Sequence, residues 1–219
     1  MERQATHTPA VIFDFDGTVA DSFSVALEVF YALTHREAFS PEDLMRLRGM
    51  TLRQLSKELK IPMHKIPFLL IRGRRAMFEH MARVRLVEGM DEVIRTLCKT
   101  HKLFILSSNS PANIEALLSE YGLAECFEAI YGDVSLLRKR QKLRQILRQH
   151  RLVEATTWYV GDEARDVEAA KRAHLRVAAV SWGFNNIHVL ASHEPTALIF
   201  TPEELITCIY NNSNYEAIH

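Results

Sequence analysis

Two aspartates separated by one residue are the first side chains of this sequence that could do chemistry. Asp14 and Asp16 lie in the segment Asp14-Phe15-Asp16-Gly17-Thr18-Val19, directly after a short apolar run. Residues i and i+2 of an extended chain point to the same side, so both carboxylates are expected to emerge together at the end of a buried strand. Gly17 permits a tight turn whose backbone amides could hold an anion. A helix cap or a simple turn is the structural alternative.

A second acidic cluster occurs in the segment Gly161-Asp162-Glu163-Ala164-Arg165-Asp166. Asp162 follows another apolar run, and Asp166 is four residues further on, so the two can share one face of a helix. An acidic helix N-terminus is the structural alternative. Carboxylates from both segments would repel each other without a cation, and a set of oxygen ligands favours a hard ion such as Mg²⁺.

Three other residues offer the hydrogen-bond donors that a phosphate would need. Ser108 and Asn109 follow an apolar run, and Lys139 lies in the basic run from Arg138 to Arg151. Capping of a helix by Ser108 or Asn109 and a solvated lysine are the structural alternatives. Their position favours the functional interpretation, since each is predicted at the sheet edge that carries the aspartates.

The elements that must position these residues alternate between strands and helices. Apolar runs predict strands, and apolar positions at helical spacing lie between them. This alternation predicts an α/β fold with a parallel sheet covered by helices on both faces. Helical periodicity continues through 20–85 with no strand-like run, which predicts an all-helical insert. The expected division is a core of 1–19 and 86–219 with an insert of 20–85. The predicted strands are 10–15, 103–106, 157–160 and 177–180.

In this order the motifs resemble those of the haloacid dehalogenase superfamily of aspartate-nucleophile phosphohydrolases, in its phosphoglycolate-phosphatase-like branch. The resemblance extends from about Ala10 to Leu205 and implies a Rossmann-like fold, and the insert is similar to the family's C1 cap. The matching segments are Asp14-x-Asp16-Gly17-Thr18-Val19, Ser108-Asn109, Lys139 and Gly161-Asp162-Glu163-Ala164-Arg165-Asp166.

The resemblance implies a nucleophile, a general acid and base, and a metal. Asp14 would attack phosphorus to form an aspartyl-phosphate, while Asp16 would protonate the leaving oxygen and later activate water. Mg²⁺ would bind the carboxylates of Asp14 and Asp162 and the main-chain oxygen of Asp16, with Asp166 assisting directly or through water.

Further residues would bind the substrate. Ser108 and Lys139 would hold the phosphoryl oxygens, with Lys142 as an alternative lysine. The other substrate contacts expected from the resemblance are Thr18, Asn109 and Arg48.

These assignments predict a Mg²⁺-dependent phosphatase of a small phosphorylated metabolite. Two alternatives stay open at this point. A sugar phosphomutase of the same superfamily would keep both Asp14 and Asp16. A polyanion-binding or nucleic-acid-binding protein could use the basic run 138–151, although that run has no interleaved aromatic residues.

The net charge of +0 is a cancellation of opposite blocks within the 219 residues. Residues 42–85 carry eleven basic and four acidic side chains, and residues 138–151 carry seven basic and no acidic ones. The remainder of the chain is therefore strongly acidic. A basic insert and an acidic core suit an anionic substrate and a cation, respectively.

The sequence carries no pattern of a disulfide scaffold or of export. The three cysteines, Cys98, Cys126 and Cys208, are far apart in the chain, lack zinc-site spacing and are expected to be reduced core residues. We expect a cytoplasmic protein, a monomer or homodimer, with no signal peptide or membrane-spanning run.

Overall fold

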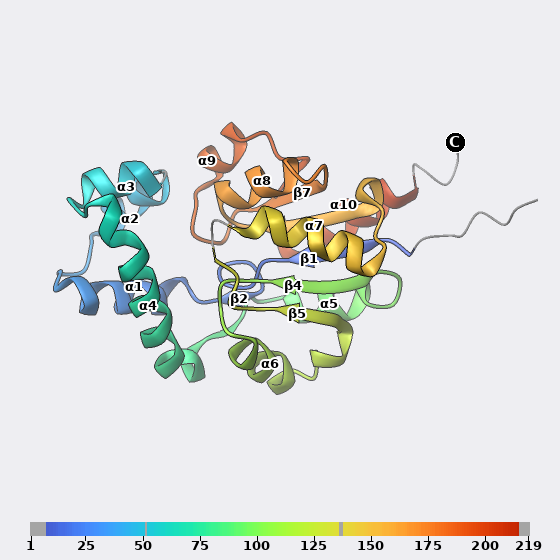
Figure 1. The fold of residues 1–219 in the computed structure, drawn as a ribbon, viewed down its shortest axis with the longest axis horizontal. Coiled ribbons are helices and arrows are strands. Elements are labelled where there is room, and N and C mark those ends of the chain that lie inside the picture. Colours follow the sequence, from blue (N-terminus) through green and yellow to red (C-terminus); the bar gives the residue numbers. More distant parts are fainter. Residues whose placement is uncertain (1–7, 51, 136–137, 215–219) are drawn as a thin grey trace, which may run out of the picture.

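Six parallel strands form one sheet at the centre of the molecule, in the order β5-β4-β1-β6-β7-β8 (Figure 1). The computed structural model describes residues 8–50, 52–135 and 138–214. Helices lie on both faces of this sheet, so the predicted α/β, Rossmann-like fold is confirmed.

The strands are β1 Ala10–Phe13, β2 Ala20–Asp21, β3 Arg85–Leu86, β4 Lys102–Leu106, β5 Phe127–Tyr131, β6 Thr157–Gly161, β7 Arg176–Val180 and β8 Ala197–Ile199. The helices are α1 Phe23–Thr34, α2 Pro41–Arg48, α3 Leu52–Glu58, α4 Ile66–His80, α5 Met90–Leu97, α6 Pro111–Glu120, α7 Lys139–His150, α8 Ala164–Lys171, α9 Ile187–Ser192 and α10 Pro202–Asn214. Across the three described ranges, no helix combines the length and the apolar character that a bilayer crossing requires.

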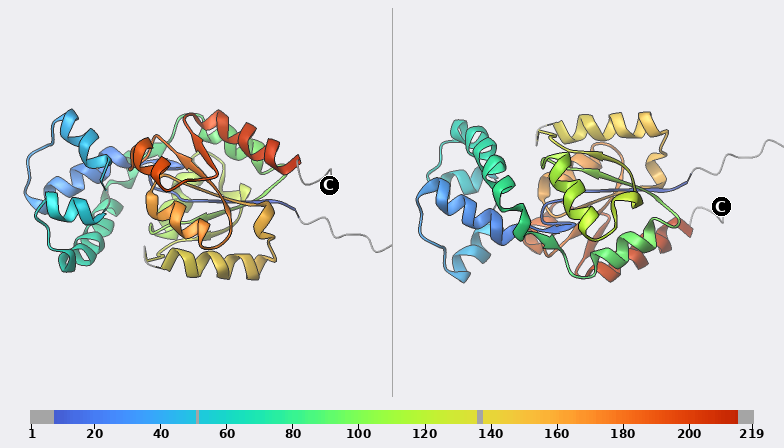
Figure 2. Two further views of the ribbon diagram at one scale, coloured as in Figure 1. Left: turned by 90° about the horizontal axis from the view of Figure 1, so that it is seen from above. Right: turned by 90° about the horizontal axis from the view of Figure 1, so that it is seen from below.

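The alternation of side chains along β1 divides the core into two layers. Val11 and Phe13 pack with residues of α5, α6 and α10, whereas Ala10 and Ile12 pack with residues of α7, α8 and α9. Figure 2 shows α7 on one side of the sheet and α5 with α10 on the other. Because both faces are covered, β1 is apolar throughout, and β4, β6 and β7 form continuous apolar runs after a polar first residue.

The helices α1 to α4 lie to one side of the sheet, beyond the carboxyl ends of its strands (Figure 1). The strands β2 and β3 bound this helical segment and pair antiparallel, with Ala20 opposite Leu86 and Asp21 opposite Arg85. Helix α4 has a proline in its first turn, Pro67, where the missing amide costs nothing.

Four strands escape the sequence-based prediction. The edge strand β5 mixes polar and apolar residues and is only partly buried, and β8 has three residues. The ribbon of β2 and β3 has two residues in each strand. None of these segments has the continuous apolar run that full burial imposes on β1, β4, β6 and β7, so the pattern that predicts the central strands is absent from them.

The packing of α7 on the sheet can be tested with one substitution. Leu143 is fully buried, so Leu143→Ala is expected to lower the free energy of unfolding by about 2–4 kcal/mol, because it leaves a cavity. Gln149 is exposed on the same helix, and Gln149→Ala is expected to change the free energy of unfolding by less than about 0.5 kcal/mol. Urea denaturation measures both, and equal effects would contradict this packing.

Candidate active site

The chain leaves β1 at the carboxyl edge of the sheet and presents Asp14 and Asp16 there. The amide of Asp14 donates to the carbonyl of Val160 at 2.8 Å, which fixes its backbone against β6. Both carboxylate oxygens of Asp16 accept from Nδ2 of Asn109, at 3.2 and 3.1 Å. Asn109 follows β4, so two neighbouring strands together orient Asp16.

The turn after Asp16 uses its own backbone amides. Gly17 has φ of +75°, a conformation that favours glycine. Its amide donates to the carbonyl of Ala20 at 2.8 Å, and the amides of the next three residues donate to the carbonyl of Phe15. The expectation that these amides hold an anion is therefore wrong, because internal hydrogen bonds of the turn satisfy them.

A buried lysine joins the two acidic segments. Lys139 is the first residue of α7 and is 2% exposed. Its Nζ donates to Asp14 Oδ2 at 2.6 Å, to Asp166 Oδ1 at 2.7 Å and to the hydroxyl of Tyr159 at 3.3 Å. A buried ammonium needs such compensation, since desolvation without partners costs several kcal/mol. The burial of the Lys139 ammonium therefore depends on the carboxylates of both Asp14 and Asp166.

Asp162 directly follows β6 and is fully buried. One carboxylate oxygen accepts from Oγ1 of Thr18 at 2.8 Å, and the other accepts from the amide of Phe184 at 2.7 Å. A Cβ at Gly183 would overlap this carboxylate. The loop after β7 therefore needs glycine at this position to approach Asp162.

Asp166 faces two ways in the first turn of α8. Its Oδ2 accepts from the amide of Glu163 at 3.2 Å and forms a capping box with that residue. Its Oδ1 accepts from Lys139 and, at 3.3 Å, from the hydroxyl of Tyr159. Asp166 thus caps the N-terminus of α8 and also belongs to the acidic cluster.

Burial and charge set the ionisation of this cluster. Burial raises the pKa of Asp14 to about 7, with Lys139 lowering it and Asp166 raising it. Burial and the neighbouring carboxylates raise the pKa of Asp162 well above its usual value. Burial also acts on Asp166, but Lys139 holds the pKa of that carboxyl below its usual value. Burial alone would lower the pKa of Lys139, but the negative charges of Asp14 and Asp166 raise it above its usual value. Lys139 therefore stays protonated.

The cluster has the composition of a site for a hard divalent cation. Asp14, Asp162 and Asp166 each offer a carboxylate oxygen, and these three atoms lie within 4.8 Å of one another. All three residues are buried, and one ammonium does not neutralise three carboxylates. After burial, repulsion by the neighbouring carboxylates contributes to the raised pKa of Asp162, and a divalent cation would relieve that repulsion.

Ser108 and Lys142 lie outside the hydrogen bonds of this cluster. Ser108 is half-buried in the loop after β4, and its side chain makes no hydrogen bond to the described residues, whereas the neighbouring Ser107 accepts from the amide of Asn109 at 3.0 Å. Lys142 lies one turn beyond Lys139 on α7, with its Nζ 4.5 Å from the centre of the Tyr131 ring.

Arg48 ends α2 and reaches the loop after β7. Its Nε donates to the carbonyl of Phe184 at 3.3 Å, and its Nη2 donates to the carbonyl of Gly183. Its guanidinium also lies over the Phe23 ring, 5.0 Å from the centroid. In this conformation Arg48 joins the helical insert to the loop that contacts Asp162.

Sequence reasoning missed two residues that hold this site together. Tyr159 looks like an ordinary apolar strand residue, but its hydroxyl contacts both Lys139 and Asp166. Trp182, in the loop after β7, donates from Nε1 to the carbonyl of Thr18 at 3.0 Å. In the sequence, only the hydroxyl of Tyr159 and the indole nitrogen of Trp182 indicate that these residues need a hydrogen-bond partner. The partner itself cannot be identified before the fold is known.

A model of the haloacid dehalogenase-like hydrolase family matches residues 11–180. Together with the parallel sheet and the aspartates at its carboxyl edge, this match shows that the chain belongs to that family. The family membership expected from the four motifs is therefore confirmed.

Individual relatives cover nearly the whole chain. The chain is 34% identical over 208 residues to phosphoglycolate phosphatase of Synechococcus elongatus, which covers 91% of this chain and 96% of that protein. It is 24% identical over 207 residues to pyrophosphatase PpaX of Listeria welshimeri, covering 91% of this chain and 95% of that one. Its fold is similar to the crystal structure of a predicted phosphatase from Clostridium acetobutylicum, with a TM-score of 0.77 at 20% identity, covering 94% and 100% of the two chains.

The raised pKa of Asp14 predicts how stability depends on pH in the metal-free protein. The folded state binds a proton at Asp14 up to a pH of about 7, whereas the unfolded state releases it near 3.9. The folded state is thus the one that holds the extra proton, and stability falls as the pH rises through this window. Relative to Asp14→Asn, which cannot ionise, the wild-type protein is expected to lose about 2 kcal/mol between pH 5 and 7. Urea denaturation in EDTA measures this, and a difference that is constant with pH would contradict it.

Proposed function

We propose that this chain is a Mg²⁺-dependent phosphatase that hydrolyses a small phosphorylated metabolite through an aspartyl-phosphate on Asp14. The observation that carries the proposal is the buried cluster in which Lys139 contacts both Asp14 and Asp166, with an oxygen of Asp162 also within reach. The named activities of the relatives, phosphoglycolate phosphatase and pyrophosphatase, support phosphate chemistry on a small substrate.

Asp14 is the proposed nucleophile. Its side chain is held from two directions, because Oδ1 accepts from the amide of Phe15 at 2.8 Å and Oδ2 accepts from Lys139 at 2.6 Å. This fixed carboxylate attacks phosphorus, and the bond from phosphorus to the ester oxygen breaks. The phosphoryl group then resides on Asp14 until water removes it.

Asp16 is the proposed general acid and base. Burial raises the pKa of Asp16, and the hydrogen bonds from Asn109 offset part of that shift. A raised pKa keeps a proton available for the leaving oxygen in the first step. In the second step the Asp16 carboxylate takes a proton from water, and that water attacks the phosphoryl group on Asp14.

Lys139 and Ser108 are proposed to hold the phosphoryl oxygens, assisted by Asn109 and Thr18. Lys139 carries a permanent positive charge beside the nucleophile, so it can stabilise negative charge that develops in the transition state. Ser108 has a side chain available for a substrate, since it makes no hydrogen bond to the described residues. Of the two candidate lysines, the contacts of Lys139 with Asp14 favour it over Lys142.

Mg²⁺ would be held by the carboxylates of Asp14, Asp162 and Asp166 and by the main-chain oxygen of Asp16. When bound, the ion offsets the repulsion between the Asp14 carboxylate and an incoming phosphate. Thr18 and the amide of Phe184 orient the Asp162 carboxylate for this role.

Residues 20–85 are proposed to form a cap over this site, with residues 1–19 and 86–219 as the catalytic core. Its excess of basic side chains would attract an anionic, phosphoglycolate-like substrate. Arg48, the expected substrate contact within it, is proposed to alternate between the carbonyls of the loop after β7 and the anionic leaving group.

Removing the nucleophile tests the mechanism. Asp14→Asn is expected to lower kcat for an aryl phosphate by at least about 10³-fold, because the amide cannot attack phosphorus. Asp91→Asn, an exposed carboxylate on α5, serves as the matched control and is expected to keep wild-type kcat. Release of inorganic phosphate is the measurement, and full activity of Asp14→Asn would refute the mechanism.

Two lysine variants distinguish the candidates on α7. Lys139→Met is expected to lower kcat about 10²- to 10³-fold, whereas Lys142→Met is expected to stay within about twofold of wild type. Steady-state kinetics give kcat, and circular dichroism checks that both variants fold. The reverse ranking would assign the phosphate-binding role to Lys142.

Metal removal tests the cofactor. EDTA is expected to abolish activity and Mg²⁺ to restore it, and Asp162→Asn is expected to raise the Mg²⁺ concentration for half-activation about tenfold or more. Activity that persists in EDTA would rule out the metal.

The substrate class can be determined by screening phosphoglycolate, sugar phosphates, nucleoside monophosphates and pyrophosphate. Inorganic phosphate as the product supports the phosphatase, while an isomerised sugar phosphate would favour the phosphomutase alternative. Tight, salt-sensitive polyanion binding without turnover would favour the binding-protein alternative.

A further inference from the structure

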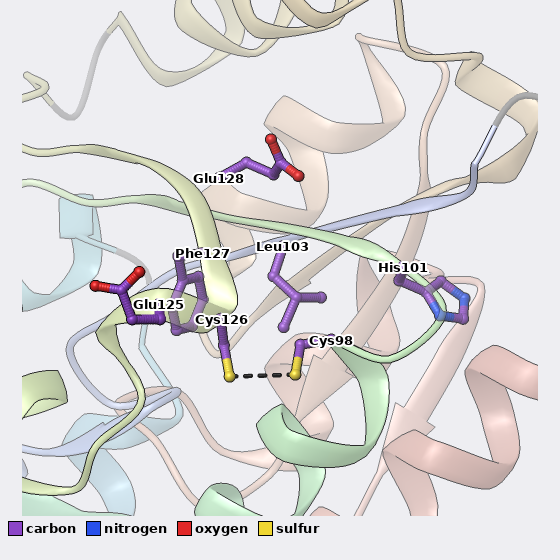
Figure 3. Close-up of a pocket in the computed structure, with 7 residues that line it drawn as sticks. All are labelled: Cys98, His101, Leu103, Glu125, Cys126, Phe127 and Glu128. Carbon is purple, nitrogen blue, oxygen red and sulfur yellow. Dashed lines mark hydrogen bonds between the residues drawn. The ribbon is translucent and has the colours of Figure 1, made fainter.

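Two cysteines that are far apart in the chain meet at the sheet edge opposite the aspartates. Cys98 follows the last residue of α5, and Cys126 ends a short 3₁₀ helix, Ala124–Cys126, directly before β5. Their Sγ atoms are 3.1 Å apart (Figure 3). Both residues precede strands of the parallel sheet, so they lie at its amino edge, whereas Asp14 lies at its carboxyl edge.

Both thiols border a cavity, so small molecules can reach them. The three cysteines are free, as expected, and pack against the core, but Cys98 and Cys126 are only partly buried at its margin. The cavity has a volume of about 400 Å³, and Figure 3 shows the side chains of Cys98 and Cys126, which both line it, pointing toward each other. It is lined by Cys98, His101, Leu103, Glu125, Cys126, Phe127 and Glu128.

We propose that Cys98 and Cys126 form a thiol–disulfide exchange site, which closes to an intramolecular disulfide when it meets a low-molecular-weight disulfide. A sulfur–sulfur bond is about 2.05 Å long, so bond formation requires the two sulfur atoms to approach by about 1 Å. Rotation of two partly exposed side chains can supply such a movement without displacing the backbone.

The exchange proceeds in two steps. Cys98 Sγ attacks one sulfur of the small disulfide, which forms a mixed disulfide and releases one small thiolate. Cys126 Sγ then attacks Cys98 Sγ, which forms the protein disulfide and releases the second small thiolate. The two protein thiols lose their protons through water to the two released thiolates, so the protein is oxidised by two electrons and the small disulfide is reduced to two thiols.

The order of these steps follows from the surroundings of Cys126. Burial and the neighbouring Cys98 raise the pKa of the Cys126 thiol to about 11, and its Sγ donates to Cys98 Sγ. We assign Cys98 as the attacking thiol on the geometry of this hydrogen bond, because its sulfur accepts the proton that Cys126 donates, and Cys126 as the resolving thiol. Glu125 and Glu128 at the cavity would repel an anionic reagent, so a neutral disulfide is the suitable oxidant.

The crosslink would stabilise the fold locally. It joins two residues 28 positions apart, and the segment between them contains β4, α6 and the loop with Ser108 and Asn109. The disulfide would covalently connect the end of α5 to the start of the edge strand β5. Closing a loop of this length restricts the unfolded chain, and the melting temperature is expected to rise by about 5–10 °C.

The test oxidises the full-length, fully reduced protein with bis(2-hydroxyethyl) disulfide at about pH 8.5, near the usual thiol pKa. Peptide mapping without reduction is expected to recover a Cys98–Cys126 crosslinked peptide, and thermal unfolding is expected to show the rise in Tm, reversed by dithiothreitol. Cys208→Ser, which keeps the pair, is the control expected to show both changes. Cys98→Ser and Cys126→Ser are expected to show neither.

Three results would overturn the proposal. The first is a stable mixed disulfide at Cys98 with no crosslinked peptide, and the second is a crosslink through Cys208 instead. The third is a Cys98–Cys126 crosslink that leaves Tm unchanged, which would remove the stabilising role. Melting of each reduced serine variant shows whether it folds, and an alanine at the same position replaces any that does not.

Discussion

The contact of one buried ammonium with two buried carboxylates is the interaction on which the rest of this structure depends. Lys139 on α7, Asp14 after β1 and Asp166 on α8 belong to three elements, and none of these charges is stable alone in an apolar interior. The register of β1 against β6 and the packing of α7 and α8 on one face of the sheet must all be correct for the charges to meet. The requirement for charge compensation therefore links the fold to the chemistry.

The same requirement explains the distribution of charge. The basic run of α7 has two sides, since Leu143 and Ile146 pack into the core while Arg144 and Arg148 are exposed. Lys139 alone among the basic residues named in that run is directed into the acidic cluster, within the part of the chain that the structure describes. A net charge of zero thus conceals two basic segments, 42–85 and 138–151, and an acidic remainder to which the buried carboxylates of Asp14, Asp162 and Asp166 belong.

The sequence predicts those parts of the fold in which burial leaves a pattern. The central strands carry continuous apolar runs because both faces of the sheet are covered, and on α7 the buried residues Leu143 and Ile146 follow the helical period. The strands β5 and β8 are too exposed or too short to show such a run. Motif spacing likewise predicts which carboxylates meet. It does not predict that Tyr159 or Trp182 supports them, nor that Cys98 meets Cys126, since these contacts join residues distant in the chain and arise only from tertiary packing.

The ribbon of β2 and β3 has an evolutionary consequence. Since Ala20 lies opposite Leu86, the chain leaves the core and re-enters it at almost the same point. The segment between β2 and β3 is therefore attached to the sheet in the same way as a hairpin loop, whatever the length of the segment. Insertions, deletions and helix exchanges there are absorbed without moving the end of β1. The segment can therefore diverge faster than the scaffold that carries it, and a foreign helical unit grafted between the same two strands should leave the aspartates in register.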